Sequence, residues 1–318
     1  MATASRVLNG SSRRVQQEYT DRVLVAAEQL RYHPDRTAQT MARGKSQVIG
    51  LVVSDITDPY YTGIASGVSS AAAEADGILS LATAGRDVQR RVEIIDLMHS
   101  YRAQALVLAG GMLLDLDGLT RVRVALTDLR DQVGTGVVSI GQPGLGVPTV
   151  TIPNAAAAGD LASQLLGKGF RRFGIVCGPE LQYTSSERAH GFREVVQSAG
   201  ADVIQVFGGT LDRAGGYAAM EALLDQDVEL VFAVTDMMAL GVLARLREAG
   251  MRVPEDIAVA GFGDIPILAD VTPAVSTVRI DLVALGRLAV ELCLNPPHPD
   301  TRVEANYQIL LRESTERR

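Results

Sequence analysis

Residues 48–61, with the sequence VIGLVVSDITDPYY, contain the pattern that decides the fold. The run Val48–Val53 is made of apolar and small residues, most of them β-branched, and such a run predicts a strand. Because no polar residue alternates with the apolar ones, both faces of this strand are expected to be covered. A helical pattern follows the run after a short polar turn.

The same unit of a strand followed by a helix recurs along the chain. Strand-like runs of this kind are also found at Ile78–Ala82, Ala105–Ala109, Val137–Ile140, Phe173–Val176, Val203–Phe207, Leu230–Val234 and Ile257–Ala260. Buried strands joined by helices form parallel sheets, and this many strands exceed what one ordinary sheet holds. The pattern predicts an α/β protein with two doubly wound parallel sheets, one in each of two lobes.

The boundary between the lobes is expected at Gly141–Pro148 (GQPGLGVP), where glycine and proline interrupt the pattern. The first lobe then covers residues 47–148, and the second begins near Thr149. The end of the chain shows a strand, a helix and a strand at Ser276–Arg279, Leu282–Leu294 and Tyr307–Leu311. Local sequence rules do not assign these last elements to a lobe.

The first 46 residues differ in kind from the rest. They contain two short helical patterns joined by the turn Asn9–Ser12, and Pro34 ends the second of them. A third helical stretch, Arg36–Arg43, leads to the first strand. The apolar stripes of the first two patterns consist of Val7, Leu8, Tyr19, Val23, Ala27 and Leu30.

Charge is distributed unevenly along the chain. Residues 1–47 carry a net charge of +4 and the remaining residues carry −11, which gives −7 in total. A basic end on an acidic body attracts a polyanion at that end only, and this pattern is typical of oriented nucleic-acid binding. A solvated, charged terminus is the alternative that charge alone leaves open.

Several function classes lack support in the sequence. The two cysteines, Cys177 and Cys293, lie in separate apolar runs, and the histidines have no metal-ligand spacing. We expect no metal and no cofactor, and we expect no catalysis because there is neither a GxGxxG motif after the first strand nor a nucleophile elbow. No export signal and no apolar run of about 18 residues is present, so a cytoplasmic protein without membrane contact is predicted.

Many segments in the same order resemble the lactose-repressor (LacI/GalR) family. They are Ser5–Gly10, Arg22–Glu28, Tyr32–Pro34, Ile49–Val53, Asp58–Tyr61, Arg188–Phe192, Asp236–Gly241, Gly261–Pro266, Thr277–Arg279 and Arg312–Thr315. The resemblance implies a helix-turn-helix headpiece and a hinge helix in residues 1–46, followed by a core like that of periplasmic sugar-binding proteins. It also implies chain crossings between the lobes, with about 280–303 joining the first lobe and about 304–318 the second.

The resemblance further implies a homodimer, or a tetramer, on a palindromic double-stranded operator. In that picture Thr3–Asn9 is the recognition helix. Arg6 contacts base edges while Thr3 and Ser5 hold phosphates, and an ordinary surface helix is the alternative. In the hinge, which contains Arg43, Met41 stands where relatives have a leucine that enters the minor groove, or it packs on the dimer mate.

One departure from the family concerns the start of the chain. Relatives have a helix and a turn before the recognition helix, whereas here Met1 stands close to that helix. We expect the headpiece to be truncated and the true start to lie upstream, with Val7, Leu8 and Ala27 partly uncovered. If Met1 is genuine, the chain is a ligand-binding dimer that no longer binds DNA. A transport-type sugar-binding protein is a further alternative, but it requires an export signal.

The effector, a sugar or a sugar-like molecule, is expected beyond the carboxyl ends of the strands. Residues at such positions are Tyr60, Tyr61, Arg188, Thr235, Asp236, Phe262 and Asp264. Arg188 suits hydroxyls or a carboxylate, with a surface ion pair to Glu187 or Glu194 as its alternative role. The tyrosines could be structural aromatics, and Asp236 could cap the helix that begins there. Several relatives that respond to sugars have asparagine at Thr235 and aspartate at Gly263, so a bulkier or acidic ligand that engages Arg188 is a second possibility.

Overall fold

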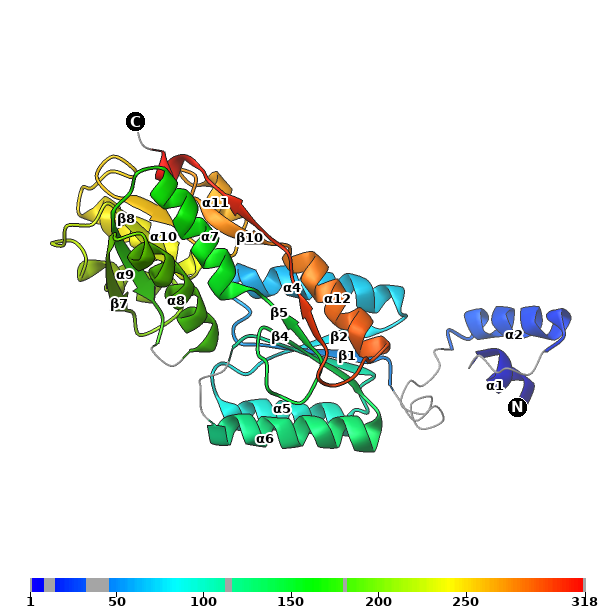
Figure 1. The fold of residues 1–318 in the computed structure, drawn as a ribbon. Coiled ribbons are helices and arrows are strands. Elements are labelled where there is room, and N and C mark those ends of the chain that lie inside the picture. The colour runs from blue at the N-terminus through cyan, green and yellow to red at the C-terminus, as the bar shows by residue number, and fades with distance from the viewer. Residues whose placement is uncertain (1, 9–14, 33–45, 112–115, 180–181, 317–318) are drawn as a thin grey trace.

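The computed structural model describes residues 2–8, 15–32, 46–111, 116–179 and 182–316. Figure 1 shows a small helical head followed by two lobes, in each of which helices cover a sheet. The predicted α/β class with parallel sheets is confirmed.

The first lobe is built on a parallel sheet. Its strands are β1 (Val48–Val53), β2 (Ile78–Thr83), β3 (Ala105–Ala109), β4 (Gly136–Ile140), β5 (Thr149–Thr151) and β11 (Arg302–Glu304). Within the described residues they lie in the order β11-β5-β4-β3-β1-β2, and all neighbours are parallel. Every residue of β3 and β4 is buried, as the apolar runs predicted for the centre of such a sheet.

Helices cover both faces of this sheet. They are α4 (Pro59–Glu74), α5 (Val88–Ser100), α6 (Leu116–Asp128), which continues into a π-helical turn (Leu129–Val133), and α12 (Leu282–Leu294). α4 packs on α12, which also contacts β3 and β4, while α5 packs on α6 along the opposite face (Figure 1). Gly67 permits the close approach of α4 to α12, since a Cβ there would lie 2.0 Å from the Val283 carbonyl oxygen.

The second lobe contains a shorter parallel sheet and an antiparallel pair. The strands of the sheet are β6 (Arg172–Cys177), β7 (Asp202–Phe207), β8 (Leu230–Ala233) and β9 (Ala258–Ala260), and those of the pair are β10 (Thr277–Ile280) and β12 (Tyr307–Leu310). The strand order of the sheet in the described chain is β7-β6-β8-β9. Single bridges from Ala260 to Ser276 and from Gly263 to Arg279 link the end of β9 to β10.

Two pairs of helices pack beside the second sheet. The helices of this lobe are α7 (Asn154–Gly167), α8 (Tyr183–Ser198), α9 (Arg213–Glu221), α10 (Asp236–Glu248) and the short α11 (Ile267–Asp270), and a 3₁₀ turn follows at Glu313–Thr315. α7 packs on α8, and α9 packs on α10. Both pairs place the start of a helix at the carboxyl ends of strands, where the site described below is formed.

The chain crosses between the two sheets at three places in the described residues: from β5 to α7, from β10 to α12, and from β11 to β12. The sequence patterns did not predict β5 or β11, and they placed the start of the second lobe near Thr149. Instead, Thr149–Thr151 pairs with β4 and with β11, so the first sheet continues to Thr151. Strands of three residues are too short to show a periodicity, which is why they were missed.

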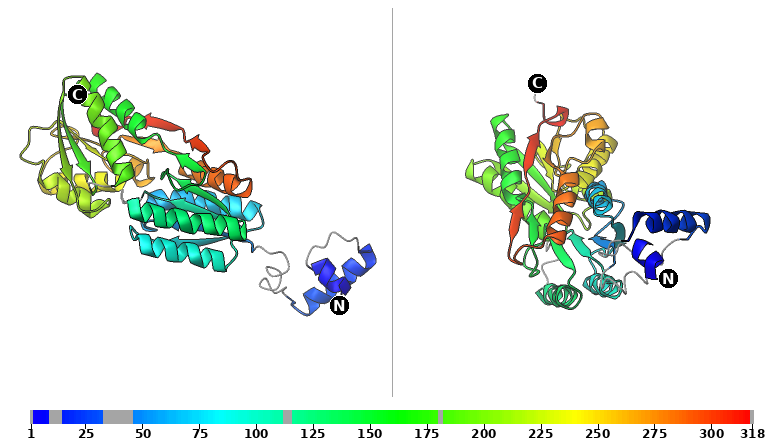
Figure 2. Two further views of the ribbon diagram at one scale, coloured as in Figure 1. Left: turned by 60° about the horizontal axis from the view of Figure 1, so that its bottom comes forward. Right: turned by 90° about the vertical axis from the view of Figure 1, so that its right-hand side faces the viewer.

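The head contains α1 (Ala2–Leu8) and α2 (Gln17–Gln29), which pack on each other and lie apart from the lobes in the views of Figures 1 and 2. No residue of α2 is buried, and Val7, Leu8 and Ala27 are only partly covered. The predicted third helical stretch, Arg36–Arg43, lies outside the described residues. The head therefore has little core of its own, in contrast to the lobes.

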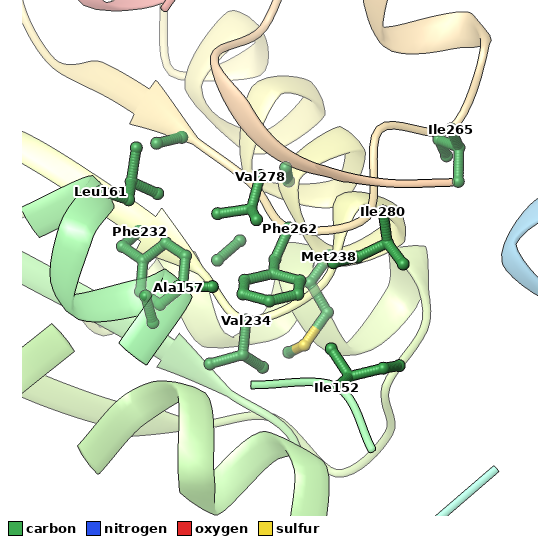
Figure 3. Packing of buried hydrophobic residues seen from close by; sticks show 14 of the residues in the cluster. Ile152, Ala157, Leu161, Phe232, Val234, Met238, Phe262, Ile265, Val278 and Ile280 are labelled. Atoms are coloured by element: carbon green, nitrogen blue, oxygen red, sulfur yellow. The ribbon is translucent and has the colours of Figure 1, made fainter. Parts of the chain in front are cut away.

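Aliphatic and phenylalanine side chains form the core of the second lobe. Figure 3 shows Phe262 next to Val234 and Met238, with Ile152 from the crossing after β5 close by. Phe262 is buried, and burial of such a side chain stabilises the fold by roughly 1.5–3 kcal/mol. This packing fixes the ring that forms part of the wall of the site.

Candidate functional site

A cavity of about 290 Å³ lies between the two lobes, at the carboxyl ends of the strands of both sheets. Ligands of open α/β sheets bind at this position. The first lobe contributes Ser54, Asp55, Thr57, Asp58, Tyr60, Tyr61, Gly85, Arg86, Gly110, Gly111, Ile140 and Gly141. The second lobe contributes Gln182, Thr184, Arg188, Thr210, Leu211, Asp212, Thr235, Asp236, Met237, Phe262 and Ile265, and Ile152 comes from the crossing.

Arg188 lies on the buried face of α8 and is 4% exposed. Its Nε donates to Asn154 Oδ1 at 2.8 Å, and its Nη1 donates to the Val234 carbonyl oxygen at 2.9 Å. The guanidinium carbon lies 3.9 Å from the centre of the Phe262 ring, a cation–π contact. Burial lowers the pKa of Arg188, and Tyr60 partly offsets this effect. Neutral partners thus orient the guanidinium without neutralising its charge.

Tyr60 and Tyr61 stand on the opposite wall, in the first turn of α4. The turn is fixed because Asp58 Oδ1 accepts a hydrogen bond from the Tyr60 N–H at 2.9 Å and Pro59 occupies the first helical position. The two rings meet edge to face, with centroids 5.4 Å apart. Burial raises the pKa of Tyr60 to about 12, and the positive charge of Arg188 partly opposes this rise. The two side chains therefore influence each other electrostatically across the cavity.

Thr235 and Asp236 occupy the turn between β8 and α10. Thr235 Oγ1 accepts a hydrogen bond from the Met238 N–H at 3.3 Å and so caps α10, a role that sequence reasoning offered to Asp236. Asp236 instead accepts hydrogen bonds from the Ile265 N–H at 2.8 Å and from the Thr277 hydroxyl at 2.7 Å. Burial raises the pKa of Asp236 to about 6. Its carboxylate ties α10 to the loop after β9 and to β10.

Asp264 is not among the residues that line the cavity in the described chain. Its Oδ2 accepts a hydrogen bond from Arg279 Nε at 2.6 Å, and its Oδ1 accepts one from Arg312 Nη2 at 2.7 Å. This position differs from the cleft-facing one that the sequence suggested. The neighbouring Gly263 packs closely on the Asp236 carboxylate, because a Cβ there would lie only 3.1 Å from Asp236 Oδ2.

Several lining residues were missed by sequence reasoning. Ser54 directly follows β1, so the rule that picks residues after each strand could have found it. Arg86 and Asp212 come from loops of different lobes; hydrogen bonds and the charge of Arg86 lower the pKa of Asp212 although burial opposes this. Asn154 carries no local signal, because its contact with Arg188 depends on the crossing after β5.

The predicted DNA-contacting residues are placed only in part. Thr3 and Arg6 are exposed on α1, and the backbone of Ser5 belongs to the same helix. Asn9, Met41 and Arg43 lie outside the described residues. The structure thus brings Thr3 and Arg6 onto one exposed helix at the basic end of the chain, which is the placement that a groove-reading helix requires.

A metal site, a membrane-spanning helix and a reactive thiol all lack support in the described residues. Among the described residues, no group of three metal-ligating side chains was found, and no helix there is long and apolar enough to span a bilayer. Cys177 and Cys293 are both buried, and burial raises the pKa of each thiol to about 12. Such thiols are poor nucleophiles at neutral pH.

Comparisons with known proteins match both ends of the chain. The model for bacterial regulatory proteins of the lacI family matches residues 1–35, and the model for a periplasmic binding protein-like domain matches residues 162–315. The HTH-type transcriptional regulator CelR of Thermobifida fusca is 32% identical to this chain over 330 aligned residues, which cover 98% of this chain and 94% of the relative.

Two solved structures extend this likeness to the fold. The complex of the transcriptional regulator CelR with cellobiose has a TM-score of 0.71 at 29% identity and covers 98% of this chain and 94% of its own. The lac repressor dimer bound to operator and the anti-inducer ONPF has a TM-score of 0.86 at 20% identity, and covers 99% of this chain and 94% of its own. At that identity the second likeness shows the fold alone.

Proposed function

The chain belongs to the lacI family of bacterial regulatory proteins, and from this premise we propose that it is a repressor whose hold on a palindromic operator is set by a sugar-type effector between its lobes. As a member of this family it is a DNA-binding transcription regulator. The proposal assigns the effector to the cavity and the operator to the basic head. Operator binding requires the protein to act in the cytoplasm, where the DNA is.

The observation that carries this proposal is the arrangement around Arg188. The guanidinium is held by Asn154 and Val234 over the Phe262 ring and faces Tyr60 of the other lobe. Oriented donors beside aromatic rings suit a polyhydroxylated ring, whose hydroxyls take the hydrogen bonds while its apolar face packs on an aromatic side chain. The cellobiose complex of the similar regulator CelR supports a sugar as the ligand class.

The effector contacts come from both lobes, so a bound ligand can change the arrangement of the lobes. A ligand that bridges Tyr60 and Arg188 favours the closed arrangement of the lobes over the open one. We assign Tyr61, Thr235, Asp236 and Phe262 to the same site, with Asp236 acting mainly through the loop it holds. The change in lobe arrangement is passed to the head through the segment before β1.

In the head, we assign base contacts to Arg6 and Asn9 and phosphate contacts to Thr3 and Ser5. The hinge residues Met41 and Arg43 are assigned to the minor groove. A palindromic operator requires two copies of the head, hence a homodimer. Exposed apolar side chains on the edge strand β2, on α5 and at its C-cap support such a contact; they are Ile78, Leu81, Leu97 and Tyr101.

The test is a titration of fluorescent duplexes from the promoters beside the gene, followed by anisotropy. We expect tight binding to one palindromic duplex and at least about 100-fold weaker binding to a scrambled one. Arg6→Ala should weaken operator binding about tenfold or more, because a base contact is lost. Arg252→Ala, which removes a surface ion pair far from the head, serves as the control. Equal binding of operator and scrambled duplex contradicts the proposal.

A further inference from the structure

Arg91 is a buried cation that forms no ion pair within the described part of the chain. It lies on the inner face of α5 with Ile94, Ile95 and Met98, and it is 1% exposed. Neither of its terminal nitrogens, Nη1 and Nη2, has a hydrogen-bond partner in the described structure. An unpaired charge in such surroundings destabilises a fold by several kcal/mol. Burial accordingly lowers the pKa of Arg91. A residue that is this costly to the folded state calls for a ligand.

The Arg91 guanidinium lies behind the first-lobe wall of the effector cavity. The charge of Tyr61 raises the pKa of Arg91, and Tyr61 lies beside Ser54 at Gly110. Both Ser54 and Tyr61 line the cavity, whereas Arg91 does not. Arg91 therefore acts on the effector space through a wall that carries hydroxyl groups.

A glycine in the backbone lets the Ser54 and Tyr61 hydroxyls lie together at this corner. Gly110 follows β3 with a φ of +109°, and a Cβ there would lie 2.6 Å from Ser54 Oγ and 2.8 Å from the Tyr61 hydroxyl oxygen. Tyr61 and Arg91 each lie in the first turn of a helix, α4 and α5.

We propose that Ser54, Tyr61 and Arg91 form a subsite for a carboxylate, so that the effector is a sugar acid, such as an aldonate or a uronate. The inference rests on the proposed function, because it concerns the same cavity. The hydroxyls of Ser54 and Tyr61 donate to the carboxylate, and Arg91 compensates its charge from behind. Arg188, on the opposite wall, holds the hydroxyls of the ligand.

The charge of the surrounding wall favours a carboxylate over a phosphate. Asp55 and Asp58 line the cavity on the same lobe as the subsite. These carboxylates repel a phosphate dianion more strongly than a carboxylate, whose single negative charge one guanidinium can balance.

The experiment compares each acid with its neutral counterpart on the full chain. The pairs are D-glucuronate with D-glucose, D-galacturonate with D-galactose, and D-gluconate with sorbitol, and binding is measured by calorimetry. We expect at least one acid to bind about 50-fold or more tightly than its partner, and Arg91→Gln to reduce this preference below about threefold. Arg91→Lys should keep part of it. Arg90→Gln, one residue away on the exposed face and paired with Glu93, should keep all of it.

A second measurement needs no ligand. Replacing an unpaired buried charge by an apolar side chain of similar length should raise the melting temperature of the ligand-free protein by about 2–4 °C in Arg91→Met. A lower melting temperature in Arg91→Met shows that the guanidinium is structural and overturns the inference. Equal affinity for an acid and its neutral counterpart also overturns the inference of an acid subsite. If the neutral counterpart nevertheless changes operator affinity, the proposed function stands. If no compound of the panel binds, both the acid subsite and the sugar-type effector are contradicted.

Discussion

The two walls of the cavity hold their charges in different ways. On the second-lobe wall, Arg188 is fixed by an amide, a carbonyl and a ring, and Asp236 accepts two hydrogen bonds. Behind the first-lobe wall, the terminal nitrogens of Arg91 have no hydrogen-bond partner in the described residues. One wall is thus assembled before a ligand arrives, whereas the other lacks an anion.

This difference indicates which wall sets affinity and which sets selectivity. A side chain that is already oriented loses little freedom when the ligand binds, so the second-lobe wall supplies general affinity for hydroxyl groups. An uncompensated positive charge gains interaction energy only with an anionic ligand. The first-lobe side of the cavity therefore discriminates between acidic and neutral ligands. The following predictions test the two halves of this division, in order of decreasing effect.

The largest effect is expected from Arg188→Ala. The substitution removes the oriented donor and leaves Asn154 Oδ1 and the Val234 carbonyl oxygen without their partner. Affinity for the tightest-binding compound of the sugar and sugar-acid panel should fall about 1,000-fold, which corresponds to roughly 4 kcal/mol. Arg193→Ala, on the same helix but paired with Gln205 outside the cavity, is the matched control. A loss of affinity smaller than about fivefold in Arg188→Ala would contradict the claim that the second-lobe wall supplies most of the affinity.

Asp264→Asn should affect stability more than binding. Its carboxylate is nearly buried and pairs with both Arg279 and Arg312, so removing the charge should lower the free energy of unfolding by about 3 kcal/mol. Urea denaturation measures this, with the exposed Asp300→Asn as the control. Because Asp264 does not line the described cavity, effector affinity should change less than about threefold. If Asp264→Asn keeps its stability but loses effector affinity, Asp264 contacts the ligand and this prediction is wrong.

Asp236 should make the free energy of unfolding depend on pH. Its pKa is about 6 in the folded protein and 3.8 ordinarily, so the folded state binds more protons between these values. The contribution of this group to stability therefore falls as pH rises through that window, by at most about 1.4 kcal/mol per pH unit. Asp236→Asn should gain stability relative to the original chain from pH 4 to 6, as followed by urea denaturation at each pH. A flat difference, or one of opposite slope, contradicts the burial argument.

The smallest effect is expected from Gly110→Ala on the first-lobe wall. The added Cβ would clash with Ser54 Oγ and the Tyr61 hydroxyl and would strain a positive φ, at a cost of roughly 2 kcal/mol in unfolding free energy. Gly144→Ala is a matched control in the same lobe and away from the cavity, since it has a positive φ but nothing within 4 Å of its Cβ, and should lose only about 1 kcal/mol. The preference for acids should weaken in Gly110→Ala alone. Identical behaviour of the two variants would mean that this corner is not shaped for a ligand.

The sequence predicted those parts of the molecule that depend on local pattern. Long apolar runs such as Val48–Val53 and Ala105–Ala109 became strands with the expected bounds, and the helix Leu282–Leu294 was placed correctly. The three-residue strands β5 and β11 were missed because their pairing is set by the crossings rather than by local periodicity.

Within the site, residues directly after strands could be predicted, whereas those placed by tertiary contacts could not. Arg188 and Tyr60 fell into the cavity, but Asp264 pairs with Arg279 and Arg312, one of them far along the chain. Arg91 did leave a signal, because it shares a helical stripe with Ile94, Ile95 and Met98, where a charged residue is out of place. A cation in the apolar stripe of a helix beside a ligand site is therefore a useful sequence marker.

The most direct test of the account is whether the cavity and the operator are coupled. The dissociation constant of the tightest-binding panel compound is measured by calorimetry with and without saturating operator duplex, and that of the operator with and without saturating compound. The account predicts that both constants change by the same factor, at least about fivefold, because coupling between two sites is reciprocal. Constants that are unchanged by the other ligand would contradict it.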